Sequence, residues 1–249
     1  MNKVERILSK VRVMASMLFF ISGTYANNLD QLARQCNTDK SSLAHNYTKI
    51  YEKHFKKLQN KPLKILEIGF LTGCSARLWD KYFTNSLTRL FFLDINPELQ
   101  KYAKGLSSRC SLHIVNQDSE NELHDFIKKN GDNFDIIIDD GGHTMTQQIT
   151  SFKTLFPFLK KGGLYIIEDL HTSYWKTFGS AGEVGNPIAS ENATINFLRN
   201  LVHDVNFIGA FTGYGDRARW TREIPTLTEY QKHIESIHFY TSVCVIVKD

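Results

Sequence analysis

Two short apolar runs in this sequence each end in a pair of acidic residues. The first reads FDIIIDD and ends in Asp139 and Asp140, and the second reads GLYIIED and ends in Glu168 and Asp169. A continuous run of Ile and Leu is typical of a strand buried on both faces of a parallel sheet. Ligands of open α/β sheets bind where such strands end. The pattern therefore predicts four acids at one edge of a sheet.

These acids and a nearby histidine form a candidate metal and catalytic site. Carboxylates gathered at one edge repel one another unless a cation or hydrogen bonds offset their charge. Asp140, Glu168 and Asp169 offer hard oxygen ligands of the type that suits Mg²⁺ or Ca²⁺. His143 follows shortly after Asp140, and an imidazole with a pKa near ~6.5 can accept a proton at neutral pH. The alternative is that the acids cap the following helices and that His143 is exposed at a helix start.

A second candidate group follows the first predicted strand, residues 63–68. The turn after it contains Gly69 and Gly73, and glycine permits a positive φ and close approach of the backbone to a ligand. The spacing is not the G-x-G-x-x-G of dinucleotide-binding folds. Glu67, at the end of the strand, would repel a pyrophosphate and suits a ligand with cationic or hydroxyl groups. We therefore expect a ligand without phosphates at this turn.

Three further acids are candidate cofactor contacts. Asp94 ends the second predicted strand, where it can accept hydrogen bonds from both hydroxyls of a ribose. The alternative for Asp94 is a cap before Asn96. Asp118, after the third predicted strand, is a candidate contact for an adenine amino group, and Asp139 either faces the cofactor or caps its own turn. A nucleoside without phosphates, held by acids, fits S-adenosylmethionine (SAM).

Strand and helix patterns alternate five times along the chain, which indicates a parallel, right-handed, doubly wound sheet. The strands are predicted at residues 63–68, 90–93, 112–115, 134–139 and 164–168. The C-terminal part differs, with a helix at 193–202, a strand at 205–211, a short helix at 227–234 and a long β-branched strand at 237–247. We expect one α/β domain at residues 61–249.

Residues 1–60 are expected to form an N-terminal helical extension. Apolar residues at helical spacing between Val4 and Leu18 predict an amphipathic helix, a candidate subunit-interface helix, in preference to a signal peptide. The apolar run from Val13 to Ile21 is too short to span a bilayer, which needs about 20 residues. A second helix, starting near residues 38–42, precedes the sheet.

Composition excludes several classes of protein. The hydrophobic fraction of 42% can fill a core, and 30 basic against 26 acidic residues give a net charge of +4, with the basic residues scattered. This balance argues against a nucleic-acid-binding protein. The four cysteines lie far apart without metal or redox spacing, as expected of reduced thiols in a cytoplasmic protein.

With these residues in place, the chain from about Thr38 to its end resembles the class I SAM-dependent methyltransferases, and more narrowly the metal-dependent sugar O-methyltransferases of natural-product pathways. The motifs that carry the resemblance are Thr38-Asp39-Lys40, Glu67-Ile68-Gly69 with Gly73, Asp139-Asp140-Gly141-Gly142-His143, Glu168 to Trp175, and Ser236 to Tyr240. The resemblance implies a Rossmann-like sheet of seven strands with the last one antiparallel. It also implies Mg²⁺ on Asp140, Glu168 and Asp169, with His143 as general base.

The chain departs from this family in two respects. Gly142 stands where a serine is common in relatives. The large N-terminal domain of some relatives is missing from the sequence given, which leaves the expected homo-oligomer without direct support.

The expected function is methyl transfer from SAM to a sugar hydroxyl, with Mg²⁺ orienting and acidifying a diol. A nucleotide-linked sugar is one candidate acceptor, with Arg217 and Arg219 either clamping its phosphates or lying on the surface. Residues 175–185 are a candidate lid, and His171 is either a neighbour of the metal ligands or a substrate contact. The alternatives are a catechol-like acceptor and a non-catalytic SAM-binding module, whereas the glycine spacing disfavours an NAD oxidoreductase.

Overall fold

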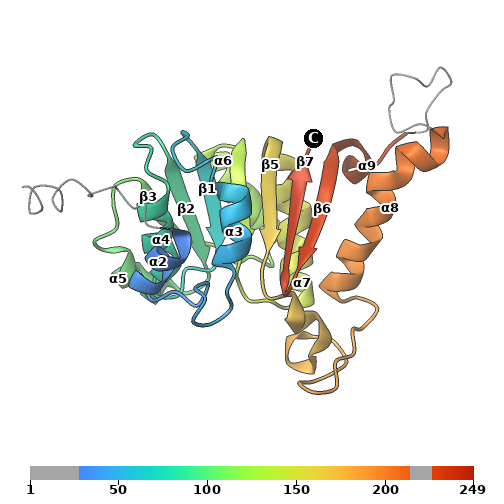
Figure 1. The fold of residues 1–249 in the computed structure, drawn as a ribbon, viewed down its shortest axis with the longest axis horizontal. Helices are drawn as coiled ribbons and strands as arrows, with labels where there is room; N and C mark the ends of the chain where they lie inside the picture. Colours follow the sequence, from blue (N-terminus) through green and yellow to red (C-terminus); the bar gives the residue numbers. More distant parts are fainter. Residues whose placement is uncertain (1–27, 214–225) are drawn as a thin grey trace, which may run out of the picture.

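The computed structural model describes residues 28–213 and 226–249. Its centre is a seven-stranded sheet with the order β3-β2-β1-β4-β5-β7-β6 (Figure 1). The strands are β1 (Lys64–Ile68), β2 (Arg89–Asp94), β3 (Cys110–Ile114), β4 (Phe134–Asp139), β5 (Leu159–Ile167), β6 (Ile234–Tyr240) and β7 (Val243–Lys248). Strands β1 to β5 pair in parallel, and β7 runs antiparallel to both β5 and β6. The predicted Rossmann-like sheet with an antiparallel last strand is confirmed.

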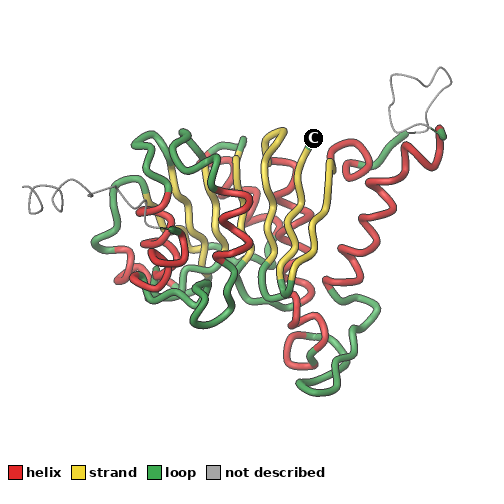
Figure 2. The backbone as a smooth tube through the Cα atoms, in the orientation of Figure 1, coloured by secondary structure: helices red, strands yellow, loops and turns green. Residues whose placement is uncertain are grey.

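Helices cover both faces of this sheet (Figure 2). The α-helices are α2 (Leu29–Gln35), α3 (Thr48–Phe55), α4 (Cys74–Tyr82), α5 (Gln100–Ala103), α6 (Glu120–Asn130), α7 (Met145–Leu155), α8 (Thr194–Thr212) and α9 (Glu229–His233). Short 3₁₀ turns are η1 (Pro97–Leu99), η2 (Phe156–Phe158), η3 (Leu170–Tyr174) and η4 (Lys176–Phe178).

The alternation of side chains along the central strands divides the core in two. Ile136 and Ile138 of β4 point into the core beneath α3 and α4, and Ile137 points into the core beneath α6 and α7. All three are fully buried. Successive side chains of a strand point to opposite faces, so an unbroken run of isoleucine fills both cores. This explains why the run preceding the acids is apolar throughout.

Two predictions for the C-terminal part were wrong. Residues 205–211, predicted as a strand from their β-branched and aromatic content, belong to the 19-residue helix α8, which continues until Gly213 caps it at φ 73°. The strand propensity of single residues did not decide the structure here, because no helix-breaking residue interrupts the helix before it ends. Residues 237–247, predicted as one strand, form a hairpin of β6 and β7 that turns beside Ser242 at φ 60°.

Smaller corrections concern the ends of elements. Strand β5, predicted to begin at residue 164, begins at Leu159, and its pairing with β4 shifts register between Phe134 and Ile136. The helix predicted from residues 38–42 onward is shorter, because α3 begins at Thr48 and turns precede it. The predicted helix at residues 4–18 lies outside the described residues.

The described helices ahead of the sheet pack directly on it. Leu32 of α2 and Tyr51 of α3 belong to the same core cluster as Trp79 of α4 and Ile65 of β1. The boundary placed at residue 60 stays a prediction. In the described part of the chain, none of the helices combines the length and apolar character that crossing a membrane requires. The four cysteines are free thiols.

Candidate active site

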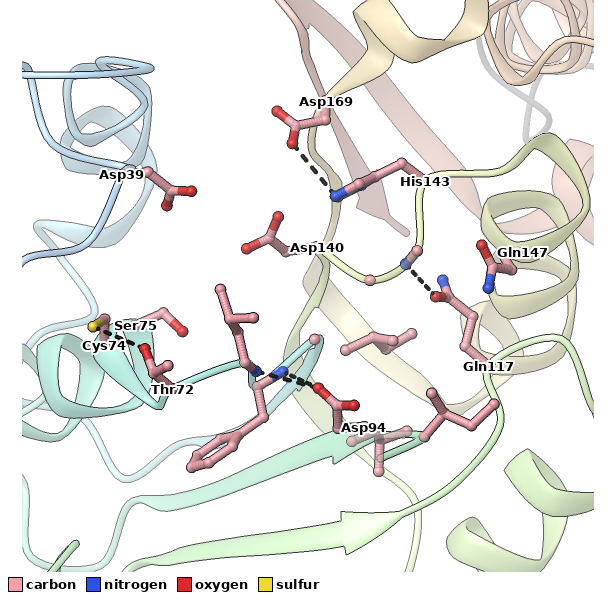
Figure 3. Close-up of a pocket in the computed structure, with 18 of the residues that line it drawn as sticks. Asp39, Thr72, Cys74, Ser75, Asp94, Gln117, Asp140, His143, Gln147 and Asp169 are labelled. Atoms are coloured by element: carbon pink, nitrogen blue, oxygen red, sulfur yellow. Dashed lines mark hydrogen bonds and ion pairs between the residues drawn. The ribbon is translucent and has the colours of Figure 1, made fainter. Parts of the chain in front are cut away.

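A pocket of about 480 Å³ opens at the carboxyl edge of the parallel strands (Figure 3). Its wall comes from the segment before α3 and from the loops that follow β1, β2, β3, β4 and β5. The lining residues lie at 37–39, 68–72, 74–75, 93–95, 115–117, 140–143, 147 and 169. Of the four acids predicted at this edge, Asp140 and Asp169 line the pocket, and Asp139 and Glu168 are buried beside it.

The turn between β1 and α4 needs glycine at two positions. Gly69 has φ 95°, and a Cβ atom there would lie 2.0 Å from the carbonyl oxygen of Asp140. Gly73 caps α4 at φ 71°, and its Cβ would lie 2.8 Å from the ring of Phe70. The strand–turn–helix path therefore depends on residues without side chains. Gly69 lines the pocket, whereas Gly73 is the N-cap of α4 and does not line it.

Asp94 lines the pocket and holds two of its loops together. Its Oδ2 accepts hydrogen bonds from the backbone N–H groups of Phe70 (3.0 Å) and Leu71 (3.2 Å), as drawn in Figure 3. Its Oδ1 accepts one from Asn96 N (3.0 Å). A carboxylate has about four acceptor positions, so the protein itself uses most of them. The capping role is present in the structure, and the contact with a ribose stays a prediction.

The predicted cofactor acids Asp118 and Asp139 do not line the pocket; Gln117 does. Asp118 is exposed beside it. Asp139 is fully buried, and burial raises the pKa of its carboxyl to about 6. Asp139 accepts hydrogen bonds from Ser151 and from Gln117 Nε2 (2.8 Å), while Gln117 Oε1 accepts one from Gly142 N (2.9 Å). Sequence reasoning missed Gln117 because an uncharged amide gave no signal beside an acid.

Asp140, His143 and Asp169 form the part of the acidic edge that faces the pocket, and we call them the open triad. Their candidate ligand atoms all lie within 4.8 Å of one another. His143 Nε2 lies 3.5 Å from Asp169 Oδ2 (Figure 3). Tyr47 donates a hydrogen bond to Asp169 Oδ1 (2.5 Å). His143 Nδ1 is buried without a hydrogen-bond partner among the described residues.

The backbone is unusual at two members of the open triad. His143 and Asp169 have φ 58° and 54°, a region that few non-glycine residues adopt. Such strain persists where the surrounding structure holds it, and it is frequent at functional sites. His143 lies just before α7 and is not part of it. The N-cap of α7 is Thr144, which forms a capping box with Gln147. A Cβ atom on Gly142 would meet the amide end of the Gln147 side chain, with Oε1 at 2.3 Å, so a side chain at this position requires Gln147 to move.

The remaining acids lie beneath the open triad, in a group that we call the closed cluster: Lys40, Tyr51, Glu67 and Glu168. Lys40 Nζ lies 2.8 Å from Glu168 Oε1 and 3.4 Å from Glu67 Oε1, and it also reaches Asp140 Oδ2 at 2.5 Å. Tyr51 donates a second hydrogen bond to Glu168 Oε1.

Burial governs the charge of the closed cluster. Glu67 is 0% exposed, accepts a hydrogen bond from Trp79 Nε1 (3.1 Å), and has its pKa raised to about 7 by burial. Burial and the neighbouring charge of Asp140 raise the pKa of Glu168, although Lys40 acts in the opposite direction. The three predicted metal ligands are thus divided. Asp140 and Asp169 belong to the open triad and Glu168 to the closed cluster, and Asp140 also contacts Lys40.

Sequence reasoning missed the role of Lys40 entirely. It interpreted Lys40 as part of a helix start, whereas the side chain reaches acids about a hundred residues further along the chain. Tyr47 and Tyr51 lie at helical spacing and belong, with His45, to the Thr38-Asp39-Lys40 motif of the family resemblance, but no role was predicted for them. Their hydroxyls bind the acids. No local pattern reports contacts at such separation. The recurrence of Thr38-Asp39-Lys40 as a motif was the available signal.

Other predicted residues lie near the site or outside the description. His171 lies beside Asp169, with Nδ1 3.1 Å from Ser242 Oγ, but it does not line the pocket. The segment predicted as a lid begins at Trp175, which bridges to Gly182. Arg217 and Arg219 lie outside the described residues.

A family model described as a methyltransferase domain matches residues 66–170. That stretch runs from β1 to the first residue of η3 and contains the glycine turn, Asp94 and the open triad. Residues 66–170 form a methyltransferase domain. The helices ahead of this methyltransferase domain supply Lys40, Tyr47 and Tyr51 to its acidic edge.

Similar proteins extend the likeness beyond the methyltransferase domain. The chain is 31% identical over 231 residues to 8-demethyl-8-(2-methoxy-alpha-L-rhamnosyl)-tetracenomycin-C 3'-O-methyltransferase of Streptomyces olivaceus, covering 89% of this chain and 54% of that protein. It is 31% identical over 187 residues to mycinamicin VI 2''-O-methyltransferase of Micromonospora griseorubida, covering 72% and 44%. The chain spans about half the length of these curated relatives.

A solved structure agrees with the sequence relatives. MycE methyltransferase from the mycinamycin biosynthetic pathway, in complex with Mg, SAH and mycinamycin VI, superposes with a TM-score of 0.73 at 27% identity. The match covers 89% of this chain and 53% of MycE.

Proposed function

We propose that this protein is a SAM-dependent O-methyltransferase that methylates a hydroxyl of a sugar with the help of Mg²⁺. The observation that carries the proposal is the open triad, which places two carboxylates and an imidazole at the mouth of the pocket that contains Gly69 and Asp94. Its relatives named above are sugar-modifying O-methyltransferases by name. MycE, with a similar fold, binds Mg and SAH.

The pocket suits SAM in size and chemistry. Its volume of about 480 Å³ falls within the usual range for small-molecule sites, roughly 300–1,000 Å³. Gly69 lets a ligand approach the backbone, and the acceptor capacity left on Asp94 suits a ribose hydroxyl. We place the cofactor against Gly69 and Asp94, which line the pocket. Glu67, Gly73, Asp118 and Asp139, the other predicted cofactor residues, lie outside the pocket lining.

The acidic edge suits a hard divalent cation. Asp140 and Asp169 offer carboxylate oxygens toward the pocket, and the unpartnered Nδ1 of His143 marks a polar site that the described residues leave incomplete. Both contacts of Glu168 with Lys40 and Tyr51 use Oε1. We therefore assign Oε2 as the candidate third ligand atom. A bound ion would supply Lewis acidity that lowers the pKa of an acceptor hydroxyl.

The residues of the open triad then divide the chemical work. His143 Nε2 takes the proton from the acceptor hydroxyl, and the resulting oxygen attacks the methyl carbon of SAM as the carbon–sulfur bond breaks. Asp169, whose Oδ2 lies 3.5 Å from Nε2, stabilises the imidazolium that forms. Positioning contributes strongly, because effective molarities of well-oriented groups reach about 10⁵–10⁸ M.

The acceptor is proposed to be a sugar bound either to a nucleotide or to a larger product, and the working form a homo-oligomer. Mass spectrometry would follow methyl transfer from SAM to alkyl rhamnosides, nucleotide-linked sugars and catechols, with Mg²⁺ or with EDTA. We expect transfer to a sugar that EDTA abolishes and Mg²⁺ restores. Full transfer in EDTA would exclude the metal role, and transfer to catechols alone would exclude the sugar. Size-exclusion chromatography with light scattering tests the oligomer.

A further inference from the structure

Lys40 is the fixed cation of the acidic edge. Its side chain is 1% exposed, and its ammonium contacts carboxylates of three neighbouring strands: Glu67 of β1, Asp140 after β4 and Glu168 after β5. The ammonium donates hydrogen bonds to Asp140 Oδ2 and Glu168 Oε1. Its contact with Glu67 Oε1, at 3.4 Å, is an ion pair. The arrangement joins the ends of three adjacent parallel strands through one charge.

The backbone around Lys40 holds it in this position. Lys40 O accepts a hydrogen bond from Thr48 N (3.1 Å) at the start of α3, and Asp39 O accepts one from His45 N (2.9 Å). Thr38 and Asp39 line the pocket on the other side. The same turn therefore provides one wall of the pocket and the cation beneath its floor. Loss of the Lys40 charge would loosen both.

We infer that Lys40 is a positioning residue that acts as a built-in counter-ion, keeping the acidic edge folded while no divalent ion is bound. Buried carboxylates without a cation are strongly unfavourable, and removing one partner of a buried ion pair destabilises a protein far more than losing a surface pair. Lys40 offsets the acids at their buried ends and leaves the outward oxygens of Asp140 and Asp169 for a ligand. The inference rests on the proposed metal role only for its Mg²⁺ arm.

The test compares K40M with K248M, a matched variant. Lys248 is also buried, but its ammonium binds the backbone carbonyls of Phe156 (3.2 Å) and Pro157 (2.7 Å) instead of carboxylates. In EDTA we expect both variants to melt below the wild type, K40M by roughly 10 °C. Millimolar Mg²⁺ should raise the melting temperature of K40M clearly more than that of K248M.

A second substitution separates charge compensation from simple packing. In K40M/E168Q the buried positive charge of Lys40 is removed together with the negative charge of its partner Glu168, so this double variant should melt above K40M. The double variant serves in place of K40M if K40M does not fold. A double variant that melts no higher than K40M, or a K40M that melts as the wild type does, would overturn the inference. Calorimetric titration of the wild type with Mg²⁺ tests the metal proposal separately: absence of binding there would refute the metal role while rescue by E168Q still supports Lys40.

Discussion

The open triad and the closed cluster consist of similar side chains in different surroundings. Asp140, His143 and Asp169 keep 16–22% of their side-chain surface exposed toward the pocket. Glu67 at the end of β1 and Glu168 after β5 are at most 2% exposed and contact Lys40. One set of acids is left with capacity for a ligand, while the other has partners from the protein itself.

The difference shows how a protein can concentrate acids at one edge without unfolding it. A carboxylate that must be available to an ion cannot also be fully neutralised by the chain, so the two tasks fall to different residues. Asp140 connects them, because it belongs to the open triad and contacts Lys40 of the closed cluster. Substitutions in the open triad should therefore reduce catalysis, and substitutions in the closed cluster should reduce stability.

The largest expected effect comes from the open triad itself. H143A should lower kcat by about 10²–10⁴-fold, the usual contribution of a general base. Binding of SAM, measured by calorimetry, should remain, because Gly69 and Asp94 are untouched. T146A, at an exposed position of α7 that does not line the pocket, is the control. A loss of less than fivefold in H143A would contradict the assignment of the base.

Acids of the two groups should separate in their response to Mg²⁺. D169N should weaken Mg²⁺ binding by about 10–100-fold with little change in melting temperature, because Asp169 is partly exposed. E168Q should change the melting temperature in EDTA as well, because Glu168 is buried against Lys40. Titration calorimetry and thermal unfolding measure the two effects. Identical profiles for the two variants would remove the distinction between the groups.

A glycine pair tests how closely the pocket wall is fitted. G69A combines a positive φ with a Cβ contact of 2.0 Å to backbone, whereas G162A has a positive φ of 74° and no atom within 4 Å. G162A should cost about 1 kcal/mol from conformation alone, and G69A about 1–3 kcal/mol more from the clash. Denaturant unfolding measures both, and equal costs would show that the wall moves freely. SAM binding should weaken only in G69A.

The smallest expected effect is on the pH dependence of folding stability, against which variants of both groups would be compared. Burial lowers the pKa of His54, which contacts Tyr240 OH at 3.0 Å away from the acidic edge. The unfolded chain therefore binds this proton more readily than the folded one, so stability should fall as pH drops below about 6.5 and stay constant above it. In H54Q the decline between pH 7 and 5 should be shallower. A decline as steep as in the wild type would assign the effect elsewhere.

Much of the fold followed from the order of residues alone. The two apolar runs that end in acids predicted β4 and β5. The alternation of strand and helix patterns predicted that the first five strands are parallel. These signals are strong because a strand buried on both faces needs an apolar residue at every position. The helix predicted at residues 193–202 is the first half of α8. The second half of α8 and the C-terminal hairpin were assigned wrongly, because β-branched residues occur in both kinds of element and no periodicity separated them.

For the site, the sequence by itself determined which acids reach the carboxyl edge, because the ends of parallel strands coincide there. Only the tertiary structure decided which acids open to the pocket and which are paired internally, and that Gln117 rather than Asp118 lines the pocket. Exposure and pairing depend on segments far apart in the chain. Lys40 reaches Glu168 across 128 residues, and such a contact exists only once the fold has formed.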